Sequence, residues 1–297
     1  MAKKNKRLKP AAAAALPSSP SLSSPPPSAE AAAVAYDSAV FEDRNVVVGR
    51  TEELKAIREF LVGHIVGNTG GHLYVCGTPG TGKTACVQVV VEGVRKWLAA
   101  DASNLGQRVK LISLRANTFN GSVKHSWDAI AKGLDIDSDS PLHIQNLMCS
   151  NASRLYVIVM DEIDLLSKDV LLSLFKLSQP KSSLVILGIA NMIDVQTKLL
   201  KDLVEAPLEL PFSPYDPKTL LAIVSKNVDL GRFAPDAMDK PLELCARKAA
   251  ANSGDARMVI DVARRAMTLA GGDMVKSEHV MRALQVCLFL SLFPFKY

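Results

Sequence analysis

Four short apolar runs along the chain have the length and composition of buried strands. They span residues 73–76, 109–114, 155–160 and 184–190. Residues 155–160 are apolar at every position, as expected for a parallel strand that is covered on both faces. Between these runs, apolar residues recur at helical spacing over residues 52–66, 84–98, 126–134 and 170–177. Strands that alternate with helices in this way predict an α/β fold, a parallel sheet with helices on both faces.

The pattern changes after Pro207, where no further strand is predicted. Helices are expected at residues 217–228, 242–252, 256–270 and, shorter, 277–284. A run of helices without strands predicts a separate helical domain. Residues 285–297 are apolar apart from a few polar positions and contain one charged side chain, Lys296, so we expect an atypical tail there.

Composition and charge single out the first part of the chain. Residues 1–44 are low in complexity and rich in Ala, Ser and Pro, which predicts a disordered tail because so little apolar surface can be buried. Five basic residues among the first nine account for the formal net charge of +5, since the rest of the chain carries 30 basic and 30 acidic side chains. This basic head is compatible with a nuclear-import patch, a loose nucleic-acid contact or a merely solvated terminus.

The cysteines and the apolar segments exclude two other classes of protein. The five cysteines are scattered and form no C-x-x-C pair, which is typical of a reduced, intracellular chain rather than a disulfide or zinc framework. The longest apolar run, residues 286–295, is too short and too interrupted to span a bilayer, and the basic start precedes no signal-peptide h-region. We therefore expect no membrane partner.

The stretch between the first strand and the next helix matches the phosphate-loop pattern G-x-x-x-x-G-K-[ST]. Its residues are Gly77, Thr78, Pro79, Gly80, Thr81, Gly82, Lys83 and Thr84. The glycines let backbone N–H groups close around phosphate oxygens, while Lys83 can reach the β- and γ-phosphates. The Thr84 hydroxyl can hold Mg²⁺. ATP and Mg²⁺ are therefore the expected cofactors.

Three other sites place polar side chains where they can meet that loop. Asp161 and Glu162 end the apolar strand at 155–160, and the carboxyl ends of parallel strands lie beside the phosphate loop. Asp161 would bind Mg²⁺, and Glu162 would act as general base toward the attacking water. Asn191 ends the next strand at the same edge and can report the γ-phosphate. Arg257 opens a helix of the second domain and can reach the γ-phosphate if that domain folds over the nucleotide.

Together these motifs resemble the AAA+ ATPases, in which a P-loop base domain precedes an all-helical lid. The residues of these motifs are similar to those of the initiator branch, the origin recognition complex subunit 1 / cell division control protein 6 family. Residues 48–54, 74–83, 159–164, 188–191 and 254–258 carry the similarity, which covers about residues 46–284. The Gly-Ile-Ala-Asn strand at 188–191 and Phe-Ser-Pro-Tyr at 212–215 bring it closest to the cell division control protein 6 members.

The resemblance implies a role for each part of the chain. The base domain would span residues 45–206 and the lid residues 207–284. Asn191 would be the first sensor of the γ-phosphate and Arg257 the second. Val47, Val48 and Arg50 fall in the family's adenine-side segment.

The resemblance also implies an activity. The family binds ATP and loads the replicative helicase onto origin DNA together with the origin recognition complex. The chain would then be a nuclear ATPase of replication licensing that hydrolyses ATP slowly. Its partners would be origin recognition complex subunits, the replicative helicase with its loading factor, and origin DNA.

Two departures from the family leave alternatives open. The family usually carries two arginines that face the neighbouring subunit, and Lys198 and Asp202 stand at those positions here. An arginine finger raises turnover by about three to five orders of magnitude. Members also continue into a DNA-contacting winged-helix domain, whereas this sequence gives the apolar tail at 285–297. These departures favour a nucleotide-gated binding module with little turnover as an alternative; a clamp-loader type of AAA+ ATPase is a third.

Overall fold

The computed structural model describes residues 47–100, 105–119, 121–138, 140–150, 154–191 and 208–292 of the chain. Its sheet has the strand order β2-β3-β4-β1-β5, and every neighbouring pair is parallel. The strands are β1 (Gly71–Gly77), β2 (Val109–Arg115), β3 (Leu155–Asp161), β4 (Leu184–Ile189) and β5 (Leu208–Phe212). The α/β fold is confirmed, but the prediction that no strand follows Pro207 is wrong, because β5 pairs with β1 at the sheet edge.

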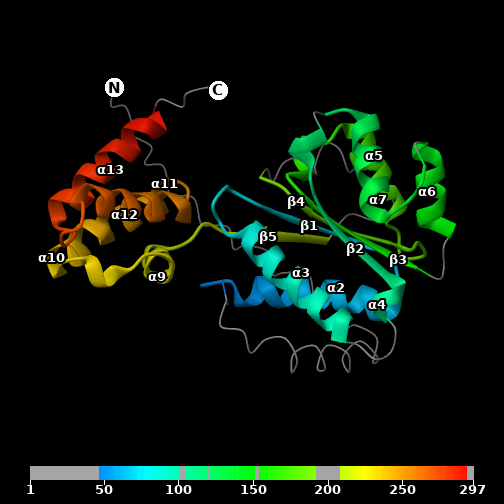
Figure 1. The fold of residues 1–297 in the computed structure, drawn as a ribbon, viewed down its shortest axis with the longest axis horizontal. Helices are drawn as coiled ribbons and strands as arrows, with labels where there is room; N and C mark the ends of the chain where they lie inside the picture. Colours follow the sequence, from blue (N-terminus) through cyan, green and yellow to red (C-terminus); the bar gives the residue numbers. More distant parts are fainter. Residues whose placement is uncertain are drawn as a thin grey trace, which may run out of the picture.

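Helices cover both faces of this sheet (Figure 1). One face carries α2 (Thr51–Gly67), α3 (Lys83–Ala100) and α4 (Leu105–Arg108), and the other α5 (Val123–Leu134), α6 (Pro141–Ser150) and α7 (Lys168–Leu177). Alternate residues of β1 enter different cores: Leu73 and Val75 pack with α2 and α3, and Tyr74 and Cys76 with the opposite cluster. All residues of β1 are buried, which explains its continuous apolar run.

The chain passes from β5 into a helical lid through residues 213–216. The lid contains α9 (Pro217–Asn227), α10 (Pro235–Ala237), α11 (Glu243–Asn252), α12 (Ala256–Ala270) and α13 (Ser277–Leu292), which lie to one side of the sheet (Figure 1). Asp216 caps α9 by accepting hydrogen bonds from the N–H groups of Lys218 and Thr219 at 2.9 and 3.0 Å, and Pro217 occupies the first helical position. A third apolar core, formed by these helices, lies inside the lid.

The helical lid extends further along the chain than the sequence predicts. The last helix does not end at Leu284 but runs to Leu292, so residues 285–292 of the expected tail continue α13. The predicted disorder of residues 1–44 and the expected finger positions Lys198 and Asp202 lie outside the described residues. Over the ranges that the structure does describe, no helix is both long and apolar enough to cross a membrane.

Candidate nucleotide-binding site

The phosphate loop connects the end of β1 at Gly77 to the start of α3 at Lys83. Gly80 and Gly82 adopt φ angles of +75° and +88°, which side chains other than glycine rarely adopt. A Cβ on Gly80 would lie 1.7 Å from the Asp255 carboxylate, and one on Gly82 would lie 2.3 Å from the Tyr215 hydroxyl. Both contacts come from the lid or from the segment that leads into it. The glycines are therefore required by the loop conformation and by the close approach of the lid.

Lys83 is buried at the start of α3, and its ammonium group lies over the loop. Its Nζ donates to the carbonyl oxygens of Gly77 and Thr78 at 2.8 and 2.9 Å. Desolvation lowers the pKa of Lys83, and the nearby positive charge of Arg257 lowers it further. An anion bound in the loop would oppose both effects, because negative charge stabilises the protonated amine.

Asp161, at the end of β3, faces the first turn of α3. The Thr84 hydroxyl donates to Asp161 Oδ2 at 3.1 Å, and Asp161 Oδ1 accepts from the N–H of Glu162 at 3.0 Å. A hydroxyl oxygen beside a carboxylate is the hard oxygen donor set that Mg²⁺ prefers, so these residues fit the metal that the phosphate loop implies. The contact joins two segments 77 positions apart in the sequence.

Glu162 has a left-handed backbone with φ +55°, uncommon for a residue other than glycine. Its Oε2 is buried, and the described residues offer it no hydrogen-bond partner. Such strain and an unpaired carboxylate oxygen recur at functional sites. Glu162 also lines the cavity, so its carboxylate stands beside the space that a nucleotide and its attacking water would fill.

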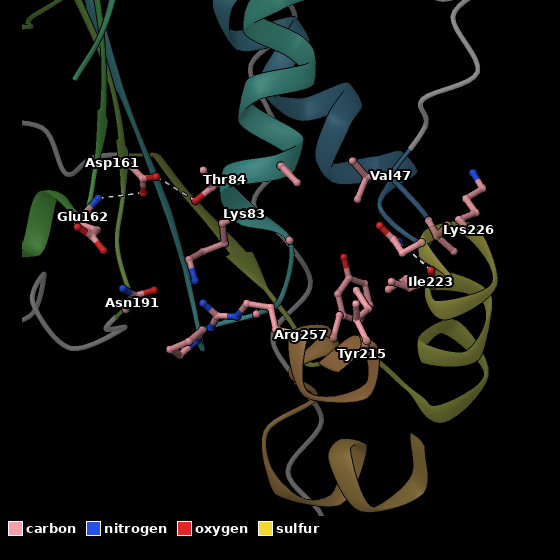
Figure 2. Close-up of a pocket in the computed structure, with 18 residues that line it drawn as sticks. Val47, Lys83, Thr84, Asp161, Glu162, Asn191, Tyr215, Ile223, Lys226 and Arg257 are labelled. Atoms are coloured by element: carbon pink, nitrogen blue, oxygen red, sulfur yellow. Dashed lines mark hydrogen bonds between the residues drawn. The ribbon is translucent and has the colours of Figure 1, made fainter. Parts of the chain in front are cut away.

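The two sensor candidates approach from opposite sides. Asn191 follows β4, and its backbone N–H donates to Asp164 Oδ2 at 3.4 Å. Arg257 opens α12 in the lid, and its Nε and Nη2 donate to the Asp255 carboxylate at 3.2 and 3.1 Å. Figure 2 shows Arg257 below Lys83, while Asn191 lies with Asp161 and Glu162 at the edge of the sheet.

A cavity of about 490 Å³ lies between the base domain and the lid, and these side chains line it (Figure 2). The lining includes most of the predicted site: Val47, Val48, Pro79, Gly80, Gly82, Lys83, Thr84, Asp161, Glu162, Asn191 and Arg257. It also includes residues that sequence reasoning missed: Ala85, Tyr215, Ile223, Lys226, Asn227, Ala256 and Ile260. Most of these come from the lid, so the cavity is built by both domains.

The remaining predicted residues are not part of this lining. Gly77 and Thr78 serve the loop through their carbonyl groups, which accept from Lys83. Thr81 serves it through its hydroxyl, which donates to Thr78 O at 2.8 Å. Arg50 is buried beside the loop, with its guanidinium bound to protein groups. Of the three residues predicted for the adenine side, Val47 and Val48 line the cavity and Arg50 does not.

The fold and the site define a class: a P-loop nucleotide-binding domain of the AAA+ type with a helical lid. The AAA domain family matches residues 66–199. The human cell division control protein 6 homolog is 31% identical over 80% of this chain, and the Arabidopsis thaliana homolog B is 33% identical over 76%. The Schizosaccharomyces pombe origin recognition complex subunit 1 is 31% identical over 74% of the chain. The chain belongs to the AAA+ initiator family of origin recognition complex subunit 1 and cell division control protein 6.

Solved structures agree with this assignment. A chain of the Drosophila ORC bound to DNA matches with a TM-score of 0.67 and 27% identity, over 93% of this chain and 70% of the other. The Aeropyrum pernix ORC1 protein in complex with DNA matches with a TM-score of 0.64 and 26% identity, over 84% of this chain and 70% of the other. The chain spans less than half the length of the curated relatives, 43% of the human homolog and 47% of the Arabidopsis one.

Proposed function

We propose that the chain is an ATP-dependent replication initiation factor that binds ATP and Mg²⁺ in the cavity between base and lid. This proposal rests on one observation: a single cavity is lined both by residues of the base and by Arg257 of the lid. The base residues are Lys83, Thr84, Asp161 and Glu162. A cavity closed by two domains can bind nucleotide differently according to its phosphates, as a nucleotide switch requires. The similarity to initiator proteins gives this switch a role in replication.

Each residue has a distinct part in the proposed site. Lys83 would exchange its carbonyl partners for phosphate oxygens, and Thr84 and Asp161 would hold Mg²⁺. The metal, when bound, neutralises developing charge on the phosphates. The unpaired Glu162 Oε2 would accept a proton from the attacking water. Asn191 would orient that water or bond the γ-phosphate, and Arg257 would bind the γ-phosphate from the lid.

The partners follow from the similarity and are part of the proposal. Two related proteins have solved structures bound to DNA or in complex with it. Origin DNA is therefore the proposed nucleic-acid ligand. Origin recognition complex subunits, the replicative helicase and its loading factor are the proposed protein partners. We propose nuclear action, because the replication origins of a eukaryotic cell lie in the nucleus and the basic head suits import.

Substitution of Lys83 tests the nucleotide site directly. Lys83→Ala should weaken ATP binding by about 10- to 100-fold, because a hydrogen bond to a charged group contributes about 1.5–3 kcal/mol. Titration with a fluorescent ATP analogue measures the affinity. Lys55→Ala, which removes an exposed lysine from α2, is the matched control and should bind as the wild type does. Wild-type affinity in Lys83→Ala would refute the proposed site.

A nucleotide-gated binding module with little turnover is the second candidate function. It is favoured by Asp202, an acidic residue at a position where the family supplies an arginine finger. Steady-state ATP hydrolysis distinguishes the two. For an ATPase, Glu162→Gln should abolish turnover and leave ATP binding intact. Glu59→Gln, on the exposed face of α2, should change neither turnover nor ATP binding. Tight ATP binding with turnover near zero in the wild type would select the binding module.

A further inference from the structure

Arg50 is one of the few charged side chains buried in the described structure, with 4% of its surface exposed. It lies directly before α2, beside the phosphate loop. A buried guanidinium is costly unless its donors and its charge are satisfied. Its partners therefore indicate which parts of the molecule it holds together.

The first partner is the phosphate loop. Arg50 Nε donates to the carbonyl oxygen of Thr81 at 3.1 Å. The described chain contains no cis peptide bond, and in a trans peptide the C=O and N–H point in opposite directions. The bond to Arg50 thus turns the N–H of Gly82 away from Arg50, and Gly82 lines the cavity. Arg50 thereby fixes the orientation of a loop amide without itself touching the nucleotide space.

The second partner is the connection into the lid. Arg50 Nη2 donates to the carbonyl oxygen of Ser213 at 2.5 Å, within residues 213–216 that join β5 to α9. The guanidinium carbon lies 5.0 Å from the Phe212 ring centroid and 4.2 Å from that of Tyr215. Phe212 belongs to a core of the base domain and Tyr215 to the core of the lid. Arg50 is therefore placed where the two cores meet.

The third partner supplies the charge balance. Glu53, in the first turn of α2, accepts from Arg50 Nη1 at 2.5 Å. This pair balances the buried charge and anchors the guanidinium to α2, but Glu53 contacts neither the loop nor the connection through this bond. The planar fork of arginine can reach Thr81, Ser213 and Glu53 at once, and the single ammonium of a lysine cannot.

We propose that Arg50 is a positioning residue that couples the phosphate loop to the lid. Through Thr81 it holds the loop in its binding conformation, and through Ser213 and Tyr215 it fixes the start of the lid in the matching position. Nucleotide binding and lid closure then favour one another through the same side chain. This inference rests on the proposed ATP binding, and it gives Arg50 a different role from the adenine contact that the sequence predicts.

The test separates coupling from stability with two variants. Arg50→Lys keeps the buried positive charge beside Glu53 but loses the fork, whereas Glu53→Gln keeps the fork and loses the ion pair. Arg247→Lys, on the exposed face of α11, is the matched arginine control. For each protein, ATP affinity and the thermal midpoint are measured. Hydrogen exchange of peptides spanning residues 208–221 is followed with and without Mg-ATP at concentrations that saturate that variant.

The expected result is a split between the two variants. Arg50→Lys should lower the midpoint no more than Glu53→Gln does but bind ATP about 5- to 150-fold more weakly, the usual range of coupling between sites. It should also lose the protection that Mg-ATP gives to residues 208–221. Glu53→Gln should show a lower midpoint with that protection retained, and Arg247→Lys should behave as the wild type.

Several outcomes would overturn the inference. Arg50→Lys with ATP affinity within twofold of the wild type, or with full protection of residues 208–221, would show that Arg50 does not couple the two parts. Equal loss of protection in Glu53→Gln would assign the effect to lowered stability instead. Failure of the wild type to bind ATP would refute the proposed function and this inference together. If the wild type binds ATP and Arg50→Lys matches it in ATP affinity and in protection of residues 208–221, only the role of Arg50 is refuted.

Discussion

At the scale of single residues, Asp255 holds the lid arginine that the site needs. Its Oδ1 accepts from the backbone N–H of Arg257 at 2.8 Å, which caps α12, and both carboxylate oxygens bind the Arg257 guanidinium. The Arg257 side chain is 64% exposed, so this ion pair contributes only about 0–1 kcal/mol to stability. A weak pair of this kind can exchange easily, because a bound γ-phosphate offers the guanidinium a more highly charged partner.

Asp255→Asn tests whether this ion pair competes with a bound nucleotide for Arg257. Asparagine keeps the oxygen that caps α12 but removes a negative charge next to the phosphate loop and frees Arg257. We expect ATP to bind a few times more tightly at low salt, by about 0.5–1 kcal/mol, with little change in stability. Equilibrium titration at two salt concentrations measures this effect, which screening should reduce.

Two controls identify the source of the gain. Asp273→Asn removes an exposed acidic residue that lies in the lid after α12, and it should leave ATP affinity unchanged. In the double variant Asp255→Asn/Arg257→Ala, the gain should shrink if release of the guanidinium causes it. Weaker ATP binding by Asp255→Asn would mean that Asp255 supports Arg257 in its binding position rather than competing for it.

The sequence reaches those site residues whose chemistry belongs to a local motif. Lys83, Thr84, Asp161 and Glu162 are recognised because a buried strand and a characteristic turn precede them. Tyr215 and Ile260 are not, because their place in the cavity depends on how the lid packs against the base. The sequence predicts Arg50 beside the nucleotide. Only the contacts in the folded protein show that its guanidinium bonds Thr81 and Ser213 instead of lining the cavity.

At the scale of elements, the short helical turn η2 (Ile163–Leu165) directly follows the catalytic candidate Glu162 and packs on β4. A Cβ on Gly188 of β4 would lie 2.7 Å from Ile163 Cδ1, and Ile163 directly follows Glu162. Gly188→Ala should therefore displace η2 and destabilise the protein by about 1–3 kcal/mol, as overpacking does. Urea denaturation measures the change in the free energy of unfolding.

Gly63→Ala is the matched substitution for this test. Gly63 lies inside α2, where a Cβ would meet nothing within 4 Å. Alanine there should stabilise the helix by up to about 1 kcal/mol, because glycine is a poor helix former. Opposite signs for the two alanines would support the contact between Gly188 and Ile163. A stable Gly188→Ala protein would show that Ile163 adopts another rotamer without disturbing η2.

Strands and helices are predictable where their burial produces a clear pattern of apolar residues in the sequence. The three central strands, β3, β4 and β1, are apolar runs because helices cover both faces of the sheet. The sequence does not predict β5, because this edge strand lacks a continuous apolar run. Only Phe212 of its residues is buried, and Glu209 and Pro211 interrupt the apolar pattern. The sequence does not predict the end of α13, because residues 285–292 contain no helix-stop signal. An apolar run without periodicity also does not show whether a segment is helical or an irregular tail.

At the scale of the whole molecule, the base domain and the lid have separate apolar cores that meet across the cavity. Direct contacts between them include the N–H of Ala256 donating to Gly80 O at 3.2 Å and the Thr78 hydroxyl donating to Ser253 O at 3.3 Å. Both hydrogen bonds lie at the phosphate loop. A ligand that fills the cavity would therefore bridge the two domains and stabilise their arrangement.

Mg-ATP should consequently raise the thermal midpoint of the whole protein. At a concentration about 100 times Kd, ligand binding adds about 2.7 kcal/mol, which corresponds to a rise of about 5–10 °C for a chain of this size. Chelation of Mg²⁺ with EDTA should remove much of that rise, because Asp161 then faces the phosphates without a cation between them. Scanning calorimetry measures both midpoints and shows whether base and lid unfold together. Lys83→Ala should show almost no rise, and an equal rise in that variant would mean that ATP stabilises the protein at some other place.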